Sequence, residues 1–384
     1  MRRLAALAVA AVAALSGALL AGCSDPASSA KQGQNAAETS GLPPRQPLPS
    51  WTAPPRTNFT VVASGDVLIH PDLTAQAVAD GNGTRDYRPL IAGVKQVVSA
   101  ADLAICHLEV PLAGPAGPFA GWPAFSSPPE IATALADAGY DECSTASNHV
   151  LDHGPNGVRS TLDVLDAAGI EHTGSARSAE EASAPHIIDV DGVKVGHVSF
   201  AFGFNGFREP AGMPWLANEL SVNAVLAAAR AAKQAGAEVV IASLHWGNEF
   251  QAEPTVEQQS MARAMLADDA VDLIIGHHAH VVQPFEQING KWVAYGLGNL
   301  VARHAEPRGT TEEGVIARFR FSKADGGRWH ADRADYVPTL VDLGPPIRVL
   351  DLTVVRDSDR KAKALQRLDQ VVRSRGATIA RSGG

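Results

Sequence analysis

The sequence predicts a layered α/β fold, and three observations carry this prediction. Short, nearly continuous apolar runs recur along the chain, as expected of strands that are buried on both faces. Between them lie segments with apolar residues at three- and four-residue spacing, which is typical of amphipathic helices. Two turn-forming dipeptides, Asp191-Gly192 and Asn289-Gly290, each separate two extended segments and predict β-hairpins. The fold is therefore expected to be mixed rather than built on a purely parallel sheet.

The strands are expected in chain order from the apolar runs. Five runs predict strands at residues 58–66, 101–110, 142–149, 238–245 and 271–277. The two hairpins pair residues 186–190 with 193–200 and 281–288 with 291–295. From about residue 312 the chain is expected to continue with strands at 314–321 and 347–355.

Helices are expected between these strands. The helical spacing covers residues 129–138, 156–168, 222–235 and 256–266, and a last helix is expected near 359–372. Three of these segments are followed by Gly139, Gly169 and Gly236. Glycine often caps a helix C-terminus, because the left-handed backbone of the cap costs it little. The alternation of strands and helices favours a layered arrangement.

The composition indicates a folded, acidic protein. Hydrophobic residues make up 45% of the chain and charged residues 19%, which excludes disorder throughout. There are 32 Lys+Arg against 41 Asp+Glu, giving a net charge of -9, and the basic residues form no cluster. Because nucleic-acid binding depends on clustered basic residues, we expect no nucleic-acid partner.

The N-terminus has the pattern of an export signal. Two arginines precede an uncharged apolar run over residues 4–20, which is too short for a typical membrane-spanning helix. The run ends in Leu20-Ala21-Gly22-Cys23, which resembles the bacterial lipobox, whose cysteine carries diacylglycerol and becomes the first mature residue. We therefore expect residues 1–22 to be a lipoprotein signal peptide and Cys23 to be lipidated. The alternative is an ordinary signal peptide with a chance cysteine.

The leader also bears on the rest of the chain. Residues 23–56 are rich in Ser, Pro, Ala, Gly and Gln and predict a flexible tether, with one folded domain over residues 57–384. The expected location is the extracytoplasmic face of the cell membrane, where the lipid holds the chain. An exported protein permits disulfides, so Cys106 and Cys143 either form a bridge or remain two buried thiols.

Polar side chains gather at the C-terminal ends of the apolar strands. In chain order they are Asp66, His107, Glu109, Asn148, His149, His245, His277, His278 and His280. Open α/β sheets bind ligands at this edge. Side chains alternate along a strand, so His107 and Glu109 can share a face, and so can His278 and His280. Carboxylate, amide and imidazole groups in one crevice favour a site for one or two divalent metals.

Taken singly, most of these residues have a structural explanation. Asp66 before a loop fits a helix N-cap, Asn148 fits a turn, and His245 fits a core histidine bonded to backbone. A solvated loop accounts for the histidines at 277–280. The convergence of five strand ends favours a site. The remaining histidines are interpreted as structural: His172, His186, His197, His304 and His330.

The same residues lie in motifs that resemble a known family. The motifs are Ser64-Gly65-Asp66, His107-Leu108-Glu109, Ser147-Asn148-His149, Ser243-Leu244-His245, Gly276-His277-His278-Ala279-His280 and Tyr295-Gly296-Leu297-Gly298-Asn299. In order and spacing they resemble the capsule synthesis protein CapA family. That family is associated with poly-gamma-glutamate production and is related to the calcineurin-like metallophosphoesterases. The resemblance covers residues 58–305.

The resemblance implies a fold and a set of site residues. The fold would be a four-layer metallophosphoesterase-like β-sandwich flanked by helices, binding two divalent metals (Mn, Fe or Zn). The implied metal ligands are Asp66, Glu109, Asn148, His245, His278 and His280, with Glu109 bridging the metals. His149 would act as general acid beside the leaving group. Candidates for supporting positions near these motifs are His70, His107, Asp152 and His153. For His70 and His153 the alternative is a side chain that faces solvent. The family usually has Asn where this chain has His107.

The implied function is that of a lipid-anchored cell-surface protein for the synthesis or export of a capsule polymer such as poly-gamma-glutamate. Its expected partners are that polymer and the membrane proteins that make it, and its metal site would hydrolyse a phosphoester or a polymer bond. The alternative is a non-catalytic envelope scaffold or polymer-binding protein that uses the same cleft. Several aromatic and neighbouring residues either form a wall of the cleft for a polymer or sugar or pack within loops. They are Trp122, Pro123, Phe125, Trp246 and Glu249.

Overall fold

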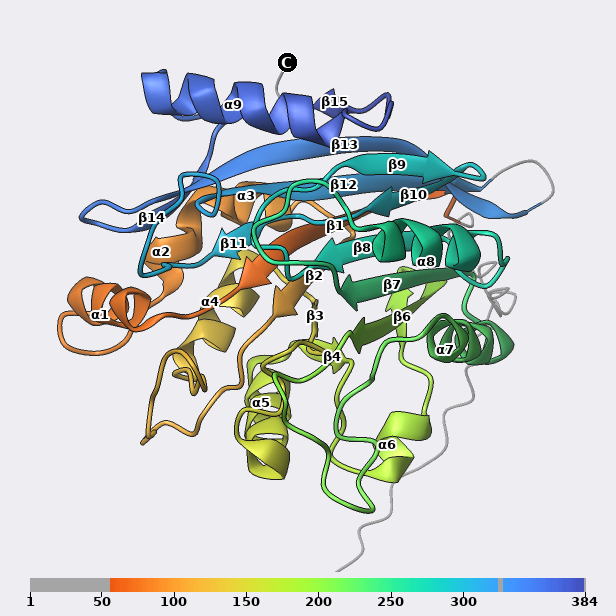
Figure 1. Cartoon of the computed structure of the whole chain (residues 1–384), viewed down its shortest axis with the longest axis horizontal. Helices are drawn as coiled ribbons and strands as arrows, with labels where there is room; N and C mark the ends of the chain where they lie inside the picture. Colours follow the sequence, from red (N-terminus) through yellow and green to blue (C-terminus); the bar gives the residue numbers. More distant parts are fainter. Residues whose placement is uncertain (1–55, 324–326, 383–384) are drawn as a thin grey trace, which may run out of the picture. The chain divides into compact units, whose positions relative to one another are not determined.

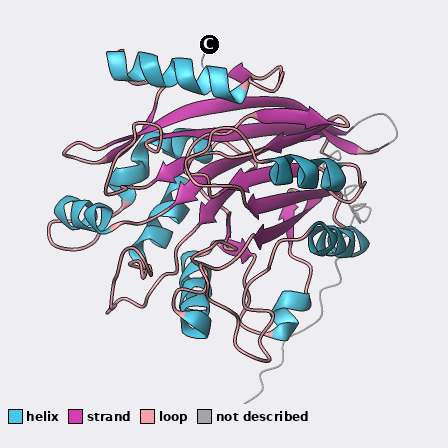
Figure 2. Cartoon of the chain, in the orientation of Figure 1, coloured by secondary structure: helices cyan, strands magenta, loops and turns pink. Residues whose placement is uncertain are grey.

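In the computed structural model, which describes residues 56–323 and 327–382, two β-sheets pack face to face with helices outside them (Figures 1 and 2). The larger sheet runs in the order β14 (Arg348–Asp351), β13 (Trp329–Asp342), β12 (Glu313–Lys323), β1 (Asn58–Val67), β2 (Leu103–Leu108), β3 (Glu142–Ser144) and β4 (Glu171–Thr173). Two short strands join it at the side: β11 (Asn299–Val301) pairs with β1, and β15 (Ala380–Arg381) pairs with β13. The strands β1 to β4 are parallel, whereas β12, β13 and β14 pair antiparallel along the main order of the sheet.

The smaller sheet is also mixed. Its order is β5 (Ile187–Val190), β6 (Val193–Ala201), β7 (Val239–His245), β8 (Leu273–His277), β10 (Lys291–Ala294) and β9 (Phe285–Ile288). The strands β6, β7, β8 and β10 are parallel, and the two outer pairs are the antiparallel hairpins expected from Asp191-Gly192 and Asn289-Gly290. Parallel strands in both sheets point their C-terminal ends to the region that holds the polar motifs.

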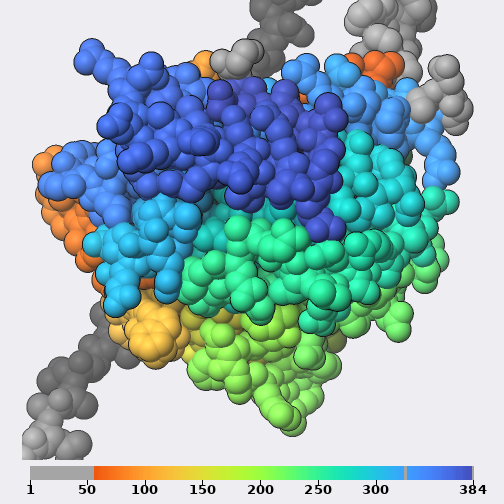
Figure 3. Space-filling view, turned by 45° about the horizontal axis from the view of Figure 1, so that its top comes forward, coloured from red at the N-terminus to blue at the C-terminus, as the bar shows by residue number. Residues whose placement is uncertain are grey.

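Helices cover both outer faces. On the larger sheet lie α1 (Pro71–Asp80), α2 (Arg88–Ile91), the 3₁₀ turn η1 (Ala92–Val94), α3 (Lys95–Val98), α4 (Glu130–Ala138) and α5 (Gly154–Ala168). On the smaller sheet lie α7 (Val222–Gln234) and α8 (Val256–Leu266), and the short α6 (Ala179–Ser183) precedes β5. The last helix, α9 (Asp359–Val372), lies over β13 and, with the C-terminal residues, forms the dark blue layer in Figure 3.

Apolar cores between the layers hold the fold together. The core between the sheets joins Val61 and Ile105 of the larger sheet to Val195, Ile241 and Ile275 of the smaller one. One outer core packs α1–α5 on the larger sheet, and another packs α7 and α8 on the smaller sheet. The central strands β1, β2, β7 and β8 therefore bury both faces, which explains their nearly continuous apolar sequences. The expected four-layer sandwich is confirmed.

Most expected elements are confirmed, but one strand ends early, and several elements, among them α1, β4 and β11, were not expected. The expected strand at 142–149 ends at Ser144, and the chain then turns through a loop before α5, so Asn148 and His149 are loop residues. The long strand β13 was not expected, because charged residues interrupt its first half and Pro338 lies in its second half. Cys106 and Cys143 lie opposite each other in β2 and β3 and are joined as a disulfide, with Cα atoms 4.4 Å apart.

The expected leader, the lipidated Cys23 and the tether up to residue 55 lie outside the described residues. Their assignment stays a prediction from the sequence. Among the helices that the structure describes, none is long and apolar enough to cross a membrane.

Candidate metal centre

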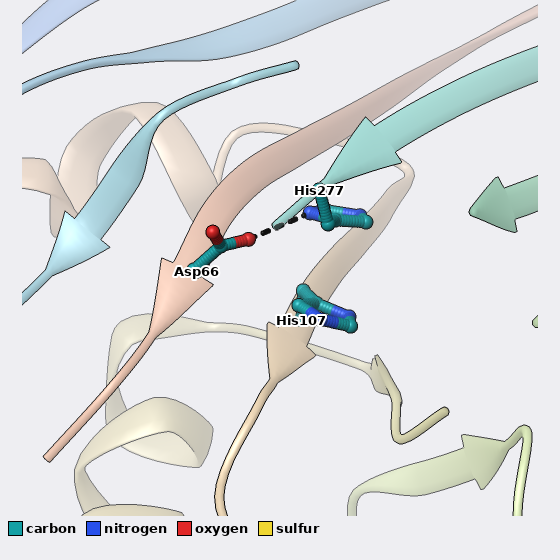
Figure 4. A group of neighbouring side chains, drawn as sticks. All are labelled: Asp66, His107 and His277. Carbon is teal, nitrogen blue, oxygen red and sulfur yellow. Dashed lines mark hydrogen bonds and ion pairs between the residues drawn. The ribbon is translucent and has the colours of Figure 1, made fainter. Parts of the chain in front are cut away.

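The C-terminal ends of four parallel strands bring polar side chains from both sheets together. Asp66 of β1 is in register with His107 of β2, and His245 of β7 is in register with His277 of β8. Figure 4 shows Asp66, His107 and His277 pointing toward one another, with Asp66 Oδ1 3.2 Å from His277 Nδ1. The rings of His107 and His277 stack with centroids 4.0 Å apart. The expected crevice therefore lies where the two sheets meet.

Two groups of potential metal ligands adjoin each other. Ligand atoms of Asp66, Glu109 and His280 all lie within 4.8 Å of one another, and so do those of Glu109, His245 and His278. Glu109 belongs to both groups, so its carboxylate lies between them. A third group joins His278 and His280 to Glu249, which is exposed. Carboxylate and imidazole donors in this number suit a divalent transition metal.

Glu109 provides the strongest indication that a cation belongs here. The residue is 1% exposed, and neither carboxylate oxygen has a hydrogen-bond partner among the residues that the structure describes. A buried carboxylate without partners is destabilising unless a cation compensates it. Burial raises the pKa of Glu109 to about 7, although His280 lies near, with its Nε2 3.6 Å from Oε1. The residues present therefore fit a bound divalent metal.

The pKa values of the two histidines after β8 are shifted in opposite directions. Burial lowers the pKa of His278 to about 3, and its Nδ1 is buried without a partner, so this imidazole is a neutral donor. Burial also lowers the pKa of His280, but Glu109 and Asp66 outweigh this and raise it to about 10. His280 Nδ1 lies 2.9 Å from Asn299 Oδ1 and 3.2 Å from Asp66 Oδ2.

The backbone at these histidines is in the left-handed region, with φ of 88° at His278 and 55° at His280. Such angles are uncommon in residues that carry a Cβ. Strained backbone of this kind concentrates at ligand-binding sites, where the surrounding structure has to enforce it.

A loop supplies the remaining motif residues. Asn148 Oδ1 lies 2.8 Å from His245 Nε2, and the Asn148 amide donates to Asn205 Oδ1 at 3.2 Å. His149 Nδ1 lies 2.8 Å from Asp152 Oδ2, and both residues are buried. Asp152 thereby fixes the orientation of the imidazole expected to act as general acid. It also accepts the backbone N–H of Phe125 at 2.7 Å.

His107, where the family usually has Asn, sits behind His245. Its Nε2 lies 2.9 Å from His245 Nδ1, and its Nδ1 lies 2.8 Å from Ser144 Oγ. Burial lowers the pKa of both imidazoles well below their usual range. His107 therefore orients His245 from the far side, which is the supporting position expected of it.

A cavity of about 520 Å³ opens over the centre, and its lining includes His304 but not His153. His304, which we interpreted as structural, lines it with its ring centroid 5.1 Å from that of His280. His70 also lines it and accepts the backbone N–H of Arg303 at 3.1 Å. Burial lowers the pKa of His70 to about 4 and that of His304 to about 3. His153, expected nearby, is exposed at the start of α5 and outside the cavity lining.

The sequence analysis assigned no role in the site to four residues that contact its side chains. His277 and Asn299 lie within quoted motifs, and strand alternation placed His277 on the face opposite His278, where it contacts Asp66. His304 lies five residues after Asn299, close enough in sequence to have been considered. Asn205 lies in the loop after β6 and contacts both Asn148 and His149. Nothing in the local sequence of Asn205 marks it as a site residue.

The architecture and the donor set define a four-layer α/β sandwich with a metal-type centre at its strand ends. Comparison with known families identifies it further: residues 60–304 match the bacterial capsule synthesis protein family PGA_cap. Because this match covers more than half of the chain, the protein belongs to that family.

Curated relatives agree with this membership. The chain is 27% identical over 225 residues to the capsule biosynthesis protein CapA of Bacillus anthracis, covering 58% of this chain and 53% of the relative. It is 28% identical over 211 residues to the PGA biosynthesis protein CapA of Bacillus subtilis, covering 54% and 53%. A probable polyglutamine synthesis accessory protein of Mycobacterium tuberculosis is 27% identical over 45% of this chain and 48% of its own. The chain thus spans about half the length of the curated relatives it matches.

Solved structures show only a distant likeness. A calcineurin-like phosphoesterase of Bacillus subtilis superposes with a TM-score of 0.43 at 16% identity, covering 82% of this chain and 98% of the other. The NAD nucleotidase of Haemophilus influenzae superposes with a TM-score of 0.44 at 11% identity, covering 85% and 64%. Similarity at this level carries no information about activity.

Proposed function

We propose that this protein is a lipid-anchored, metal-dependent phosphoesterase that serves the assembly of a capsule polymer of the poly-gamma-glutamate type at the outer face of the cell membrane. Family membership supports the polymer context. The observation that carries the enzymatic part is Glu109, a buried carboxylate that belongs to two ligand groups and has no protein partner on either oxygen.

The centre would hold two divalent ions, chosen from Mn, Fe or Zn. Asp66, Glu109 and His280 would hold one, and Glu109, His245 and His278 the other, with Asn148 beside His245. When bound, two such ions polarise a phosphate group and make water a stronger nucleophile at neutral pH. The mixed oxygen and nitrogen donors suit these metals better than Ca²⁺ or Mg²⁺, which prefer oxygen ligands alone.

The protein's own residues would handle the proton. Asp152 accepts from Nδ1 of His149 and so leaves Nε2 as the nitrogen that exchanges a proton with the leaving oxygen. His149 lines the cavity and needs no metal bond for this role. His107 keeps His245 in one orientation, because its Nε2 meets His245 Nδ1 and its Nδ1 is engaged by Ser144.

Lipid attachment through Cys23 would place this centre at the membrane, beside the proteins that make or export the polymer. Replacing Cys23 with Ser is expected to release the protein from the membrane fraction or to leave an unprocessed precursor. A Cys23→Ser variant that fractionates and migrates like the parent would show that the lipid anchor is wrong.

Metal analysis and phosphoester hydrolysis on the purified full chain test the enzymatic proposal. The parent is expected to bind divalent metal and to release p-nitrophenol from bis(p-nitrophenyl) phosphate, and His278→Ala is expected to lose both. A parent that binds metal and turns over no phosphoester would favour the non-catalytic scaffold. A His278→Ala variant with full metal content would refute the ligand assignment.

A further inference from the structure

The cavity over the metal centre has aromatic walls that the mechanism above does not use. Trp122 and Phe125 come from the loop between β2 and α4, Phe207 from the loop after β6, and Phe250 from the loop after β7. The cavity volume of about 520 Å³ lies within the range of small-molecule sites. Three separate loops therefore contribute aromatic rings to one cavity.

Two of these rings are open to solvent. Trp122 is 78% exposed and Phe207 is 46% exposed. Single exposed apolar residues are ordinary on protein surfaces. Here both rings border the same cavity, and His149 and His280 line that cavity too. Exposed apolar surface gathered at one concave site indicates a binding wall.

The backbone holds Trp122 in place although its side chain is free. Ala120 and Ser126 exchange two backbone hydrogen bonds of 2.9 Å, which close the loop tip that carries Trp122. Phe125 is tied to Asp152, the residue that orients His149. At Gly121 a Cβ would come within 2.8 Å of Pro71, so glycine lets the loop lie against α1. A pre-ordered loop costs less entropy when a ligand stacks on the ring that it carries.

The charges at the cavity do not suit a polyanion. The lining contains no lysine or arginine, and Glu249 adds an exposed carboxylate. Of the arginines nearby, Arg308 lies over the Phe250 ring at 4.1 Å, and Arg303 donates to the backbone carbonyl of His304. A poly-gamma-glutamate chain carries a carboxylate on every residue and would find little compensation along these walls. An uncharged ring would find aromatic faces to stack on.

Resting on the phosphoesterase function above, we propose that the substrate is a phosphoester whose organic part is an uncharged ring, a sugar or a nucleoside, stacked on Trp122. In hydrolysis the oxygen of water bonds to phosphorus and the ester P–O bond breaks. The leaving oxygen takes a proton from His149, and the proton lost by the water restores that imidazole through solvent. The products are the ring-bearing alcohol and the phosphate group. The capsule polymer itself is not the ligand of this cavity.

Binding to the metal-loaded full chain tests this assignment independently of turnover. Isothermal titration calorimetry would compare glucose 1-phosphate, adenosine monophosphate, glycerol 3-phosphate and a short gamma-linked glutamate oligomer. One of the ring esters is expected to bind at least about tenfold more tightly than glycerol phosphate, because the ring stacks on an aromatic side chain. Trp122→Ala is expected to remove about that factor in affinity. Trp122→Phe should retain most of it. Whichever ring ester is preferred tells a sugar from a nucleoside.

The matched control is Val354→Ala, at a side chain that is 74% exposed outside the cavity lining, and it should bind every ligand as the parent does. Four results would each overturn the proposal. They are equal affinity for ring and ringless esters, a ring preference that Trp122→Ala does not remove, tighter binding of the glutamate oligomer, and no binding of any ester. Phosphate release is measured on the same samples. Ring-selective binding that depends on Trp122 without release would refute the phosphoesterase function and leave the ligand assignment standing.

Discussion

Glu109 and Glu142 are both buried beside histidines, but their surroundings differ. Glu142 starts β3 and faces the smaller sheet, with Oε1 2.7 Å from His197 Nδ1 and 2.9 Å from His186 Nε2. Burial raises the pKa of Glu142, but the two imidazoles outweigh this and hold it at about 2. Neither oxygen of Glu109 has a hydrogen-bond partner, and burial raises its pKa to about 7.

The difference shows how a structural ion cluster can be told from a ligand site. In the cluster of Glu142, His197 uses both ring nitrogens, because its Nε2 also meets Ser243 Oγ at 2.8 Å. One oxygen of Glu142 lacks a hydrogen bond, yet the flanking imidazoles stabilise the carboxylate charge. At the strand ends, both oxygens of Glu109 and Nδ1 of His278 have no hydrogen-bond partner among the described residues and are available to bind a metal ion. Burial of histidines and carboxylates is common to both regions, and so are some unpartnered polar atoms. What distinguishes the second region is a carboxylate, Glu109, of which neither oxygen has a hydrogen-bond partner among the described residues.

The largest expected difference between the regions is in turnover. His149→Ala should lower turnover by about 10²–10⁴-fold, because it removes the general acid, while metal content and melting temperature stay near those of the parent. His197→Ala, its counterpart in the Glu142 cluster, should lower the melting temperature and leave turnover per folded molecule nearly unchanged. Measuring all three properties on one preparation checks this. The reverse pattern would mean that His149 is structural.

The next effect is on stability. Glu142→Gln should cost about 3 kcal/mol of unfolding free energy, because it leaves the imidazoles of a buried ion cluster without their counter-charge. The folded-state pKa of Glu142 is depressed to about 2 from an ordinary 4.5, so its contribution is complete above pH 4.5 and is lost as the pH falls toward 2. Burial lowers the pKa of His186, but Glu142 raises it more. The contribution of His186 to the free energy of unfolding is therefore lost as the pH rises above 6.5.

Urea unfolding from pH 2 to pH 8 measures this dependence. The parent should lose stability on the acid side, and Glu142→Gln should show a flatter acid limb. Identical acid limbs in the two proteins would mean that Glu142 is not the charged partner of His197 and His186.

A smaller effect is expected on removal of metal. Metal at about 100 times its dissociation constant adds about 2.7 kcal/mol to the stability of the form that binds it. A chelator should therefore lower the melting temperature of the parent and of Glu142→Gln, whereas Glu109→Gln should respond little. Two results would contradict the distinction between Glu109 and Glu142. One is a melting temperature of the parent that does not change with chelator, and the other is an equal change in the two variants.

The sequence predicts the strand ends well because they depend on local pattern. Apolar runs and helical spacing locate β1, β2, β7, β8 and the helices α4, α5, α7 and α8, and the polar residues after those strands converge as expected. Contacts between distant segments are not local. His304 reaches the cavity only because the chain after β11 returns over His280, and Asn205 reaches His149 from a loop of the other sheet. The partners of Glu142 likewise come from the smaller sheet.

The central claim is that Glu109, and not Glu142, is a carboxylate shared by two metal ions, and elemental analysis tests it most directly. The full chain, Glu109→Gln and Glu142→Gln would be dialysed together against a trace of divalent metal and their metal-to-protein ratios compared. We expect about two ions per chain in the parent and in Glu142→Gln, and less than one in Glu109→Gln, because the two ligand groups assigned to the ions both contain Glu109. A Glu109→Gln variant that keeps the parent's metal content, or a parent that binds none, would contradict the account.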